Sequence, residues 1–153
     1  MIDSAPGSRK TSWVVVADEA SAIVFERENS RAPLCERFAL ENPSARKKTS
    51  ERLADRGGRS FDSHGAGRHT LAREKPRSER QDAIRFAKEI AIRVHKAFLS
   101  GTCRRYALIA APRFLGLLRQ ALKTEGVTEP ELTIDKDMVG QDVDAIQALL
   151  LKQ

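Results

Sequence analysis

Trp13-Val14-Val15-Val16-Ala17 is an unbroken apolar run, mostly β-branched, near the start of this 153-residue chain. A strand with one solvated face alternates apolar and polar residues. A continuous apolar run bounded by turn residues is typical of a strand that is buried on both faces. The run therefore predicts a central strand in a sheet that is covered on both sides.

Two more strands are predicted directly after this one. Residues 22–27 and 34–40 are short apolar segments, and the polar breaks 18–21 and 28–31 separate the three runs. Connections this short cannot cross over a sheet, so the three strands are expected to form an antiparallel meander, with 34–40 at its edge. Asn42-Pro43 ends the third strand.

Helices and strands alternate in the second half of the chain. Ser78 is the expected N-cap of a helix that reaches about residue 100, and Pro112 and Gly126 are expected to begin and end the next helix. Strands are predicted at 106–111 and 132–134, and a last helix at 142–151 with Val143, Ile146 and Leu150 facing inward. The predicted class is α/β: a mixed five-stranded sheet of three antiparallel and two parallel strands, with three main helices. This order of elements is that of the ribonuclease-H-like fold.

A long basic loop interrupts this pattern. The formal net charge is +6, and residues 44–80 hold eleven basic and five acidic residues, so this stretch carries the whole excess. We expect a disordered tail at 1–11 and a single domain at 12–153, with 44–77 as an inserted basic loop. Concentrated positive charge favours a polyanionic partner such as RNA or an anionic surface. The alternative is a solvated loop that charge keeps soluble.

Glycine and arginine coincide in the middle of this loop. Gly57-Gly58 and Gly65-Ala66-Gly67 permit backbone turns whose N–H groups can cradle an anion, and neighbouring arginines can fork onto phosphate oxygens. The alternative is that the glycines serve turn geometry alone. The predicted polyanion-binding residues are Arg56, Gly57, Gly58, Arg59, Ser60, Ser63, His64, Gly67, Arg68 and His69.

An enzymatic role is the competing hypothesis. A nuclease of this fold gathers several carboxylates around two metal ions, and Asp18, at the end of the first strand, is a candidate sheet-edge site. The strand at 106–111 ends without a carboxylate, so Asp18 is expected to cap a turn or pair with an arginine. His64 and His69 fit no zinc spacing, and no third group orients Ser60 or Ser63. We predict no catalytic residues, no metal and no cofactor.

The cysteines and the apolar runs indicate in which cellular compartment the protein is expected. Cys35 and Cys103 match no metal or redox spacing, the first residues lack a signal-peptide core, and no run is long enough to span a bilayer. These features predict a cytoplasmic protein with no membrane span. His95 and Cys103 are expected to be structural, and Trp13 to be a packing residue.

Four motifs in order give the chain a family resemblance: 13–18, Gly58-Arg59-Ser60-Phe61-Asp62-Ser63, Gly67-Arg68-His69, and 111–119, which reads Ala-Pro-Arg-Phe-Leu-Gly-Leu-Leu-Arg. Together they resemble the bacterial host attachment protein family. That family is related to the middle domain of eukaryotic and archaeal peptide-chain release factors, which implies the same fold and a connection with RNA or the ribosome. The release-factor loop carries Gly-Gly-Gln, whereas this chain has Gly57-Gly58-Arg59, so hydrolysis of peptidyl-tRNA is not predicted.

The functional prediction is a non-enzymatic binding domain of the host attachment family whose loop contacts RNA or the ribosome. Two alternatives stay open: a hydrolase or nuclease of the ribonuclease-H-like fold, and a protein-interaction module whose loop orders on a protein partner.

Overall fold

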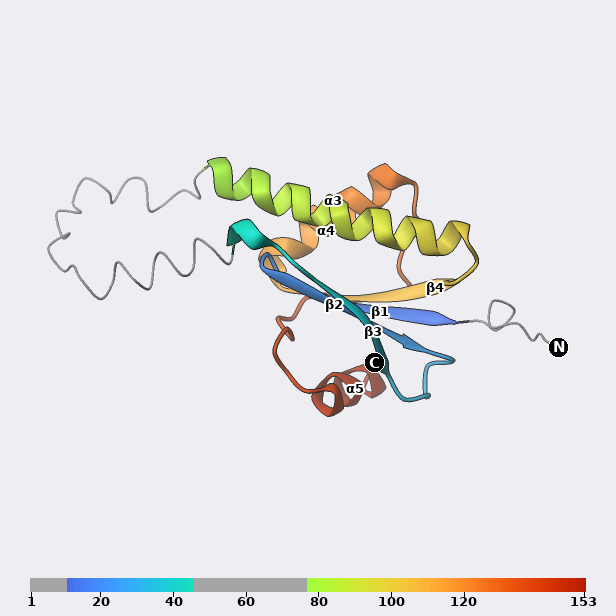
Figure 1. Cartoon of the computed structure of the whole chain (residues 1–153). Coiled ribbons are helices and arrows are strands. Elements are labelled where there is room, and N and C mark those ends of the chain that lie inside the picture. The colour runs from blue at the N-terminus through green and yellow to red at the C-terminus, as the bar shows by residue number, and fades with distance from the viewer. Residues whose placement is uncertain (1–10, 46–76) are drawn as a thin grey trace, which may run out of the picture.

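Five strands form one mixed sheet in the computed structural model, which describes residues 11–45 and 77–153 (Figure 1). The strands are β1 (Ser12–Ala17), β2 (Ser21–Arg27), β3 (Cys35–Glu41), β4 (Arg105–Ala110) and β5 (Leu132–Ile134). Their order across the sheet is β3-β2-β1-β4-β5. The first three pair antiparallel, and β4 is parallel to both β1 and β5. The predicted α/β class, the meander and the edge position of β3 are confirmed.

Within the described residues, the helices α3 (Arg77–Leu99), α4 (Pro112–Glu125) and α5 (Val143–Leu151) cover the two faces of this sheet. Figure 1 shows α3 and α4 together on one face and α5 on the other. The central strand β1 is therefore buried throughout, as its apolar run predicts.

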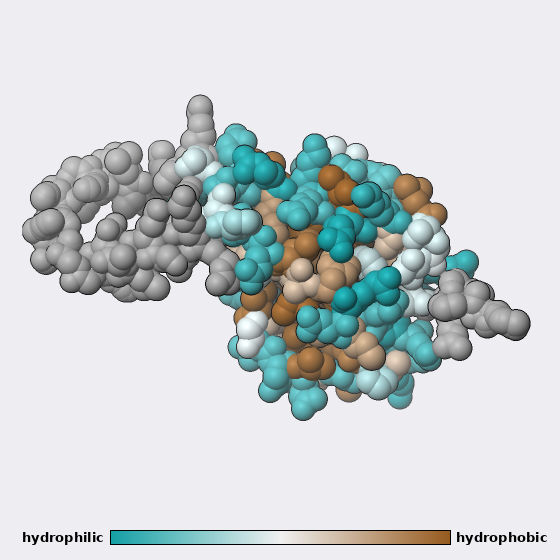
Figure 2. Space-filling model, in the orientation of Figure 1, coloured by the Kyte–Doolittle hydropathy of each residue, from teal (hydrophilic) through white to brown (hydrophobic). Residues whose placement is uncertain are grey.

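Alternation along β1 divides the core into two layers. Trp13 and Val15 pack with the buried side chains of α3 and α4, while Val14 and Val16 pack with α5. Trp13 is 3% exposed, which confirms it as a packing residue. On the face in Figure 2, hydrophilic residues predominate over the outer side of α3, and hydrophobic surface lies between α3 and α5.

An irregularity in the β2–β3 pairing affects the edge strand. Val24 pairs with Phe38, but Phe25 pairs with Glu36, so Arg37 is an extra residue. Its Nη1 donates to Glu26 Oε1 at 3.1 Å, and its guanidinium lies 5.6 Å from the Trp13 ring centroid. The bulge thus places the Arg37 guanidinium beside both the Glu26 carboxylate and the Trp13 ring.

Helix ends follow the sequence signals in most places. Pro112 begins α4, and Gly126, at φ 86°, ends it with its N–H directed at Leu122 O and Lys123 O. A residue with a side chain is strained at such a φ, so glycine suits this position. Asp142 caps α5 by accepting from the Ala145 N–H at 2.9 Å.

Two expectations for the helices were wrong. Ser78 is not the N-cap of α3, because the helix already includes Arg77; arginine is a good helix former, and a sequence pattern fixes a helix end only to within a residue or two. Val143 does not face inward but is 37% exposed. It occupies the first position of α5, whereas Ile146 and Leu150, four residues apart, form the stripe that meets the sheet.

The part of the chain that the structure describes contains no helix with the length and apolar content needed to cross a bilayer.

Candidate nucleic-acid interface

The described residues end at one side of the basic segment and resume at the other. All ten predicted polyanion-binding residues lie outside the described residues: Arg56, Gly57, Gly58, Arg59, Ser60, Ser63, His64, Gly67, Arg68 and His69. So do most of the inserted loop 44–77 and nearly all of the predicted tail 1–11. The structure instead defines the two points at which the described chain stops before residue 46 and resumes after residue 76.

Asn42 links these two points. It is buried, and its Nδ2 donates to Glu19 O at 3.0 Å and to Asp82 O at 3.5 Å, while its N–H donates to Ala20 O at 2.8 Å. One side chain thus joins the end of β3, the β1–β2 turn and the first turns of α3. Because a buried amide without partners is costly, these bonds hold the departure and return of the segment in one arrangement.

The carboxyl ends of the parallel strands β1 and β4 lie at this same end of the sheet. The Ala111 N–H donates to Ala17 O at 3.1 Å, which places the start of α4 beside the end of β1. Figure 1 shows the end of β3 and the starts of α3 and α4 gathered there. Ligands of open α/β sheets commonly bind at the carboxyl ends of the strands.

Asp18, the candidate sheet-edge residue, also lies at this end. Its Oδ1 accepts hydrogen bonds from the N–H groups of Ala20 and Ser21, both at 2.8 Å. This is the turn-capping arrangement expected from the sequence. Within residues 11–45 and 77–153, no three His, Cys, Asp or Glu side chains come close enough together to hold a metal ion.

Charge is divided unequally between the described and the remaining residues. Residues 11–45 and 77–153 contain sixteen basic and sixteen acidic residues, so their formal net charge is zero. Residues 46–76 contain nine basic and four acidic residues, a net +5, and residues 1–10 contribute the remaining +1. The folded body is neutral, and most of the excess charge belongs to the segment that Asn42 anchors.

Several charges of the body are paired with one another. Arg85 Nη1 donates to Asp82 Oδ1 at 2.8 Å. The buried Arg27 and the exposed Arg105 approach Glu131 from two sides, at 4.0 and 3.7 Å. Burial lowers the pKa of Arg27, and the charge of Glu131 opposes that shift. These cations neutralise carboxylates of the same chain, which leaves them less available to an external polyanion.

His95 and Cys103, which were predicted to be structural, both contact other parts of the fold. His95 Nδ1, on α3, lies 3.8 Å from Glu125 Oε1 on α4, and the buried Cys103 thiol donates to Arg105 O at 3.2 Å. Cys35 is a free, exposed thiol at the start of β3.

Sequence reasoning did not identify Asn42 as an anchor. The available signal was a polar residue directly before Pro43, at the boundary between an apolar strand and the basic segment. That position marks a turn, but only the fold reveals that the amide reaches Glu19 and Asp82.

Comparison with known proteins assigns the family. No curated protein matches the chain. The model of a family described as "Protein required for attachment to host cells" matches residues 13–150, from the start of the central strand to the last helix. The resemblance drawn from the four sequence motifs is thereby confirmed, and the chain belongs to the family of proteins required for attachment to host cells.

Proposed function

We propose that this chain is a non-enzymatic binding domain whose Gly/Arg-rich segment contacts RNA, in particular ribosomal RNA or tRNA. In this proposal residues 12–153 form one ribonuclease-H-like domain, related to the middle domain of release factors, that follows a disordered tail at 1–11 and acts in the cytoplasm. The ten residues of the polyanion-binding set make the contact.

The observation that carries the proposal is the division of charge. The neutral body has little net attraction for a polyanion, whereas residues 46–76 carry +5 within one segment. The Asn42 contacts join the described residues on both sides of that segment, near the carboxyl ends of β1 and β4. A cationic segment on a fixed, neutral support has a polyanion as its natural partner.

The residue types in the segment favour phosphate over other anions. Arginine presents a planar fork of donors that matches phosphate oxygens, and glycine lets backbone N–H groups approach an anion closely. Binding of this kind releases counterions from the nucleic acid, so affinity falls steeply as salt rises. We favour binding over hydrolysis because Asp18, the carboxylate at the ends of the parallel strands, is engaged by the β1–β2 turn.

Replacing Arg56, Arg59 and Arg68 together with alanine is expected to weaken RNA binding. If each arginine contributes up to about 1 kcal/mol, the loss is roughly tenfold to a hundredfold. The slope of log affinity against log salt should flatten by about two, since each lost phosphate contact to single-stranded RNA removes about 0.7. Fluorescence anisotropy with a labelled RNA across a salt series measures both quantities.

A charge-matched control separates the segment from general electrostatics. The exposed residues Arg31, Arg104 and Lys136 lie on the body, and replacing all three with alanine changes the net charge equally, from +6 to +3. This variant should keep nearly normal affinity. Equal losses of RNA affinity in the two variants, or an unchanged affinity in the Arg56, Arg59 and Arg68 variant, would show that the segment does not make the RNA contact. Salt-insensitive capture of a protein after nuclease treatment would instead favour the protein-interaction module.

A further inference from the structure

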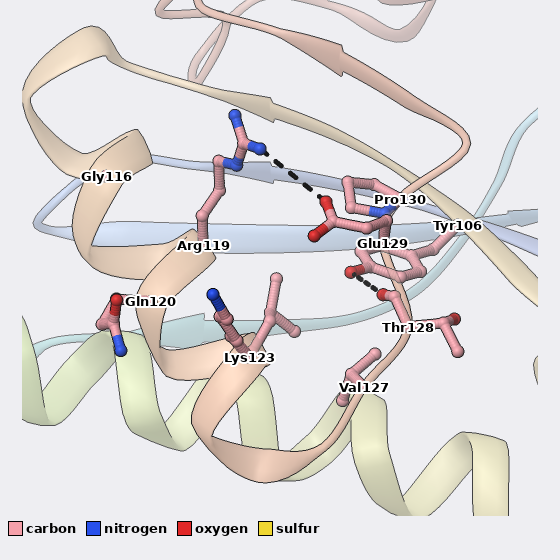
Figure 3. Close-up of a pocket in the computed structure, with 10 residues that line it drawn as sticks. Tyr106, Gly116, Arg119, Gln120, Lys123, Val127, Thr128, Glu129 and Pro130 are labelled. Carbon is pink, nitrogen blue, oxygen red and sulfur yellow. Dashed lines mark hydrogen bonds and ion pairs between the residues drawn. The ribbon is translucent and has the colours of Figure 1, made fainter.

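A second candidate site lies at the opposite end of the sheet. A cavity of about 370 Å³ opens between α4, from Gly116 to Lys123, and residues 127–130, which lead toward β5 (Figure 3). Its floor includes Tyr106, near the start of β4, so it is remote from the carboxyl ends of β1 and β4 where the basic segment is anchored. A volume of this order suits a small organic ligand.

Hydrogen bonds hold the wall of this cavity in place. The buried Tyr106 hydroxyl donates to Thr128 O at 2.8 Å, and the Glu131 N–H donates to Tyr106 O at 2.8 Å. Burial raises the pKa of Tyr106, so the hydroxyl remains a donor at ordinary pH. The Val127 N–H bonds back to Leu122 O at 3.0 Å. The connector is therefore tied to both β4 and α4, and the cavity is formed in advance of any ligand.

Positive charge predominates around the opening. Arg119 and Lys123, one turn apart on α4, are both exposed. Among the described residues that line the cavity, Glu129 is the one carboxylate, and Figure 3 shows the Arg119 side chain directed at it, with Nη2 3.7 Å from Oε1. The Glu129 side chain is 78% exposed, so this ion pair is weak. A doubly charged anion can displace the Glu129 carboxylate from Arg119.

Gly116 lines the same cavity from within α4, one turn before Gln120. Glycine inside a helix is destabilising relative to alanine. A Cβ built at this position meets no atom within 4 Å, and the φ of Gly116 is not in the left-handed region, so the fold itself does not require glycine here. Glycine at such a place permits the close approach of an external group to the helix backbone.

We propose that this cavity binds a phosphate ester of about the size of a mononucleotide. Arg119 and Lys123 hold the phosphate, and the glycine surface admits it close to α4. The apolar walls formed by Val127 and Pro130 receive the body of the ligand. The proposal does not rest on the basic segment, because no residue of 46–76 is needed for it.

The Gly116→Ala substitution is expected to stabilise the fold and to weaken ligand binding. It should raise the melting temperature by about 2–4 °C, since alanine favours the helix and meets no obstacle. It should also weaken binding of a nucleoside 5′-monophosphate, AMP, at least tenfold in calorimetric titration of the full chain. Arg119→Gln should weaken binding similarly, and Glu129→Gln should strengthen it several-fold. Arg104→Gln, an exposed charge outside the cavity, is the matched control and should bind AMP normally.

Several outcomes would overturn this site. One is a stabilised Gly116→Ala variant that binds AMP as well as the parent chain. Others are equal binding of adenosine, which lacks the phosphate, and no binding of AMP at millimolar concentration. Loss of AMP binding in the Arg56, Arg59 and Arg68 triple variant would show that the basic segment, and not the cavity, binds the phosphate. If a short RNA competes with AMP, and Arg119→Gln also weakens the binding of that RNA, the natural ligand of the cavity is a phosphate of RNA.

Discussion

Replacing Phe114 with alanine is expected to lower the free energy of unfolding by about 3–5 kcal/mol, a large part of the stability of a protein this size. Phe114 is fully buried in the first turn of α4, and its ring centroid lies 6.0 Å from that of Phe86 on α3. It packs in the cluster that joins both helices to the sheet. Its removal leaves a cavity that rigid backbone on two sides cannot close. Urea denaturation measures the change, with the midpoint falling at an unaltered slope.

Phe38→Ala is the matched control for this prediction, because it deletes the same atoms at the sheet edge. Phe38 is partly exposed and contacts the Trp13 ring at a centroid separation of 5.6 Å, with the Arg93 guanidinium 4.1 Å from its own centroid. Incomplete burial of a phenyl group and one cation–π contact amount to about 1–2 kcal/mol. A Phe114→Ala variant no less stable than Phe38→Ala would contradict the assignment of the core.

Cys103 is expected to react with a thiol reagent orders of magnitude more slowly than Cys35 in the folded protein, because Cys103 is buried and Cys35 is exposed. Burial raises the pKa of Cys103 from 9.0 to about 12, and the thiol is 1% exposed. A raised pKa leaves a much smaller thiolate fraction near neutral pH, and the reagent also needs an opening of the fold to reach the sulfur. Cys35 is exposed. Mass spectrometry of time points should show one fast and one slow modification, and comparable rates would contradict the burial of Cys103.

The same thiol predicts a loss of stability at alkaline pH. Its pKa is higher in the folded than in the unfolded chain, so its stabilising contribution is complete below about pH 9 and declines as pH rises toward 12. The slope is at most about 1.4 kcal/mol per pH unit for one group. Burial shifts the pKa of Tyr106 in the same direction, which extends the decline to higher pH. A Cys103→Ala variant should show a flatter profile just above pH 9, and an equally steep one would assign the decline to other groups.

Most of the fold could be predicted because local signals and long-range packing agree in it. The apolar run 13–17 is shielded from water only in the middle of a sheet that is covered on both faces. Pro112 and Gly126 mark the start and the end of α4, because their backbone conformations suit those positions. For Val143 the prediction was wrong because tertiary packing decided which residues of α5 face the sheet. Val143 follows the apolar pattern of α5, but the line that meets the sheet runs through Ile146 and Leu150.

The candidate sites were less accessible to sequence reasoning. Charge identified the basic segment, because charge is a property of composition and needs no fold. The anchoring role of Asn42 depends on contacts with Glu19 and Asp82, 23 and 40 residues away in the chain. The cavity beside α4 likewise combines a helix face with a connector that only the fold brings opposite it. One local signal was present in the sequence: Gly116, within the Phe-Leu-Gly-Leu-Leu-Arg stretch of 114–119, stands inside a predicted helix, where glycine is destabilising.

Cosedimentation with ribosomes of the native cell, across a salt series, tests whether the basic segment binds ribosomal RNA. If the basic segment contacts ribosomal RNA, the protein pellets with ribosomes at low salt and is released steeply as salt rises, because phosphate contacts are lost to competing counterions. The Arg56, Arg59 and Arg68 triple variant should be released at lower salt than the Arg31, Arg104 and Lys136 variant. A protein that stays in the supernatant at every salt concentration would contradict ribosome binding.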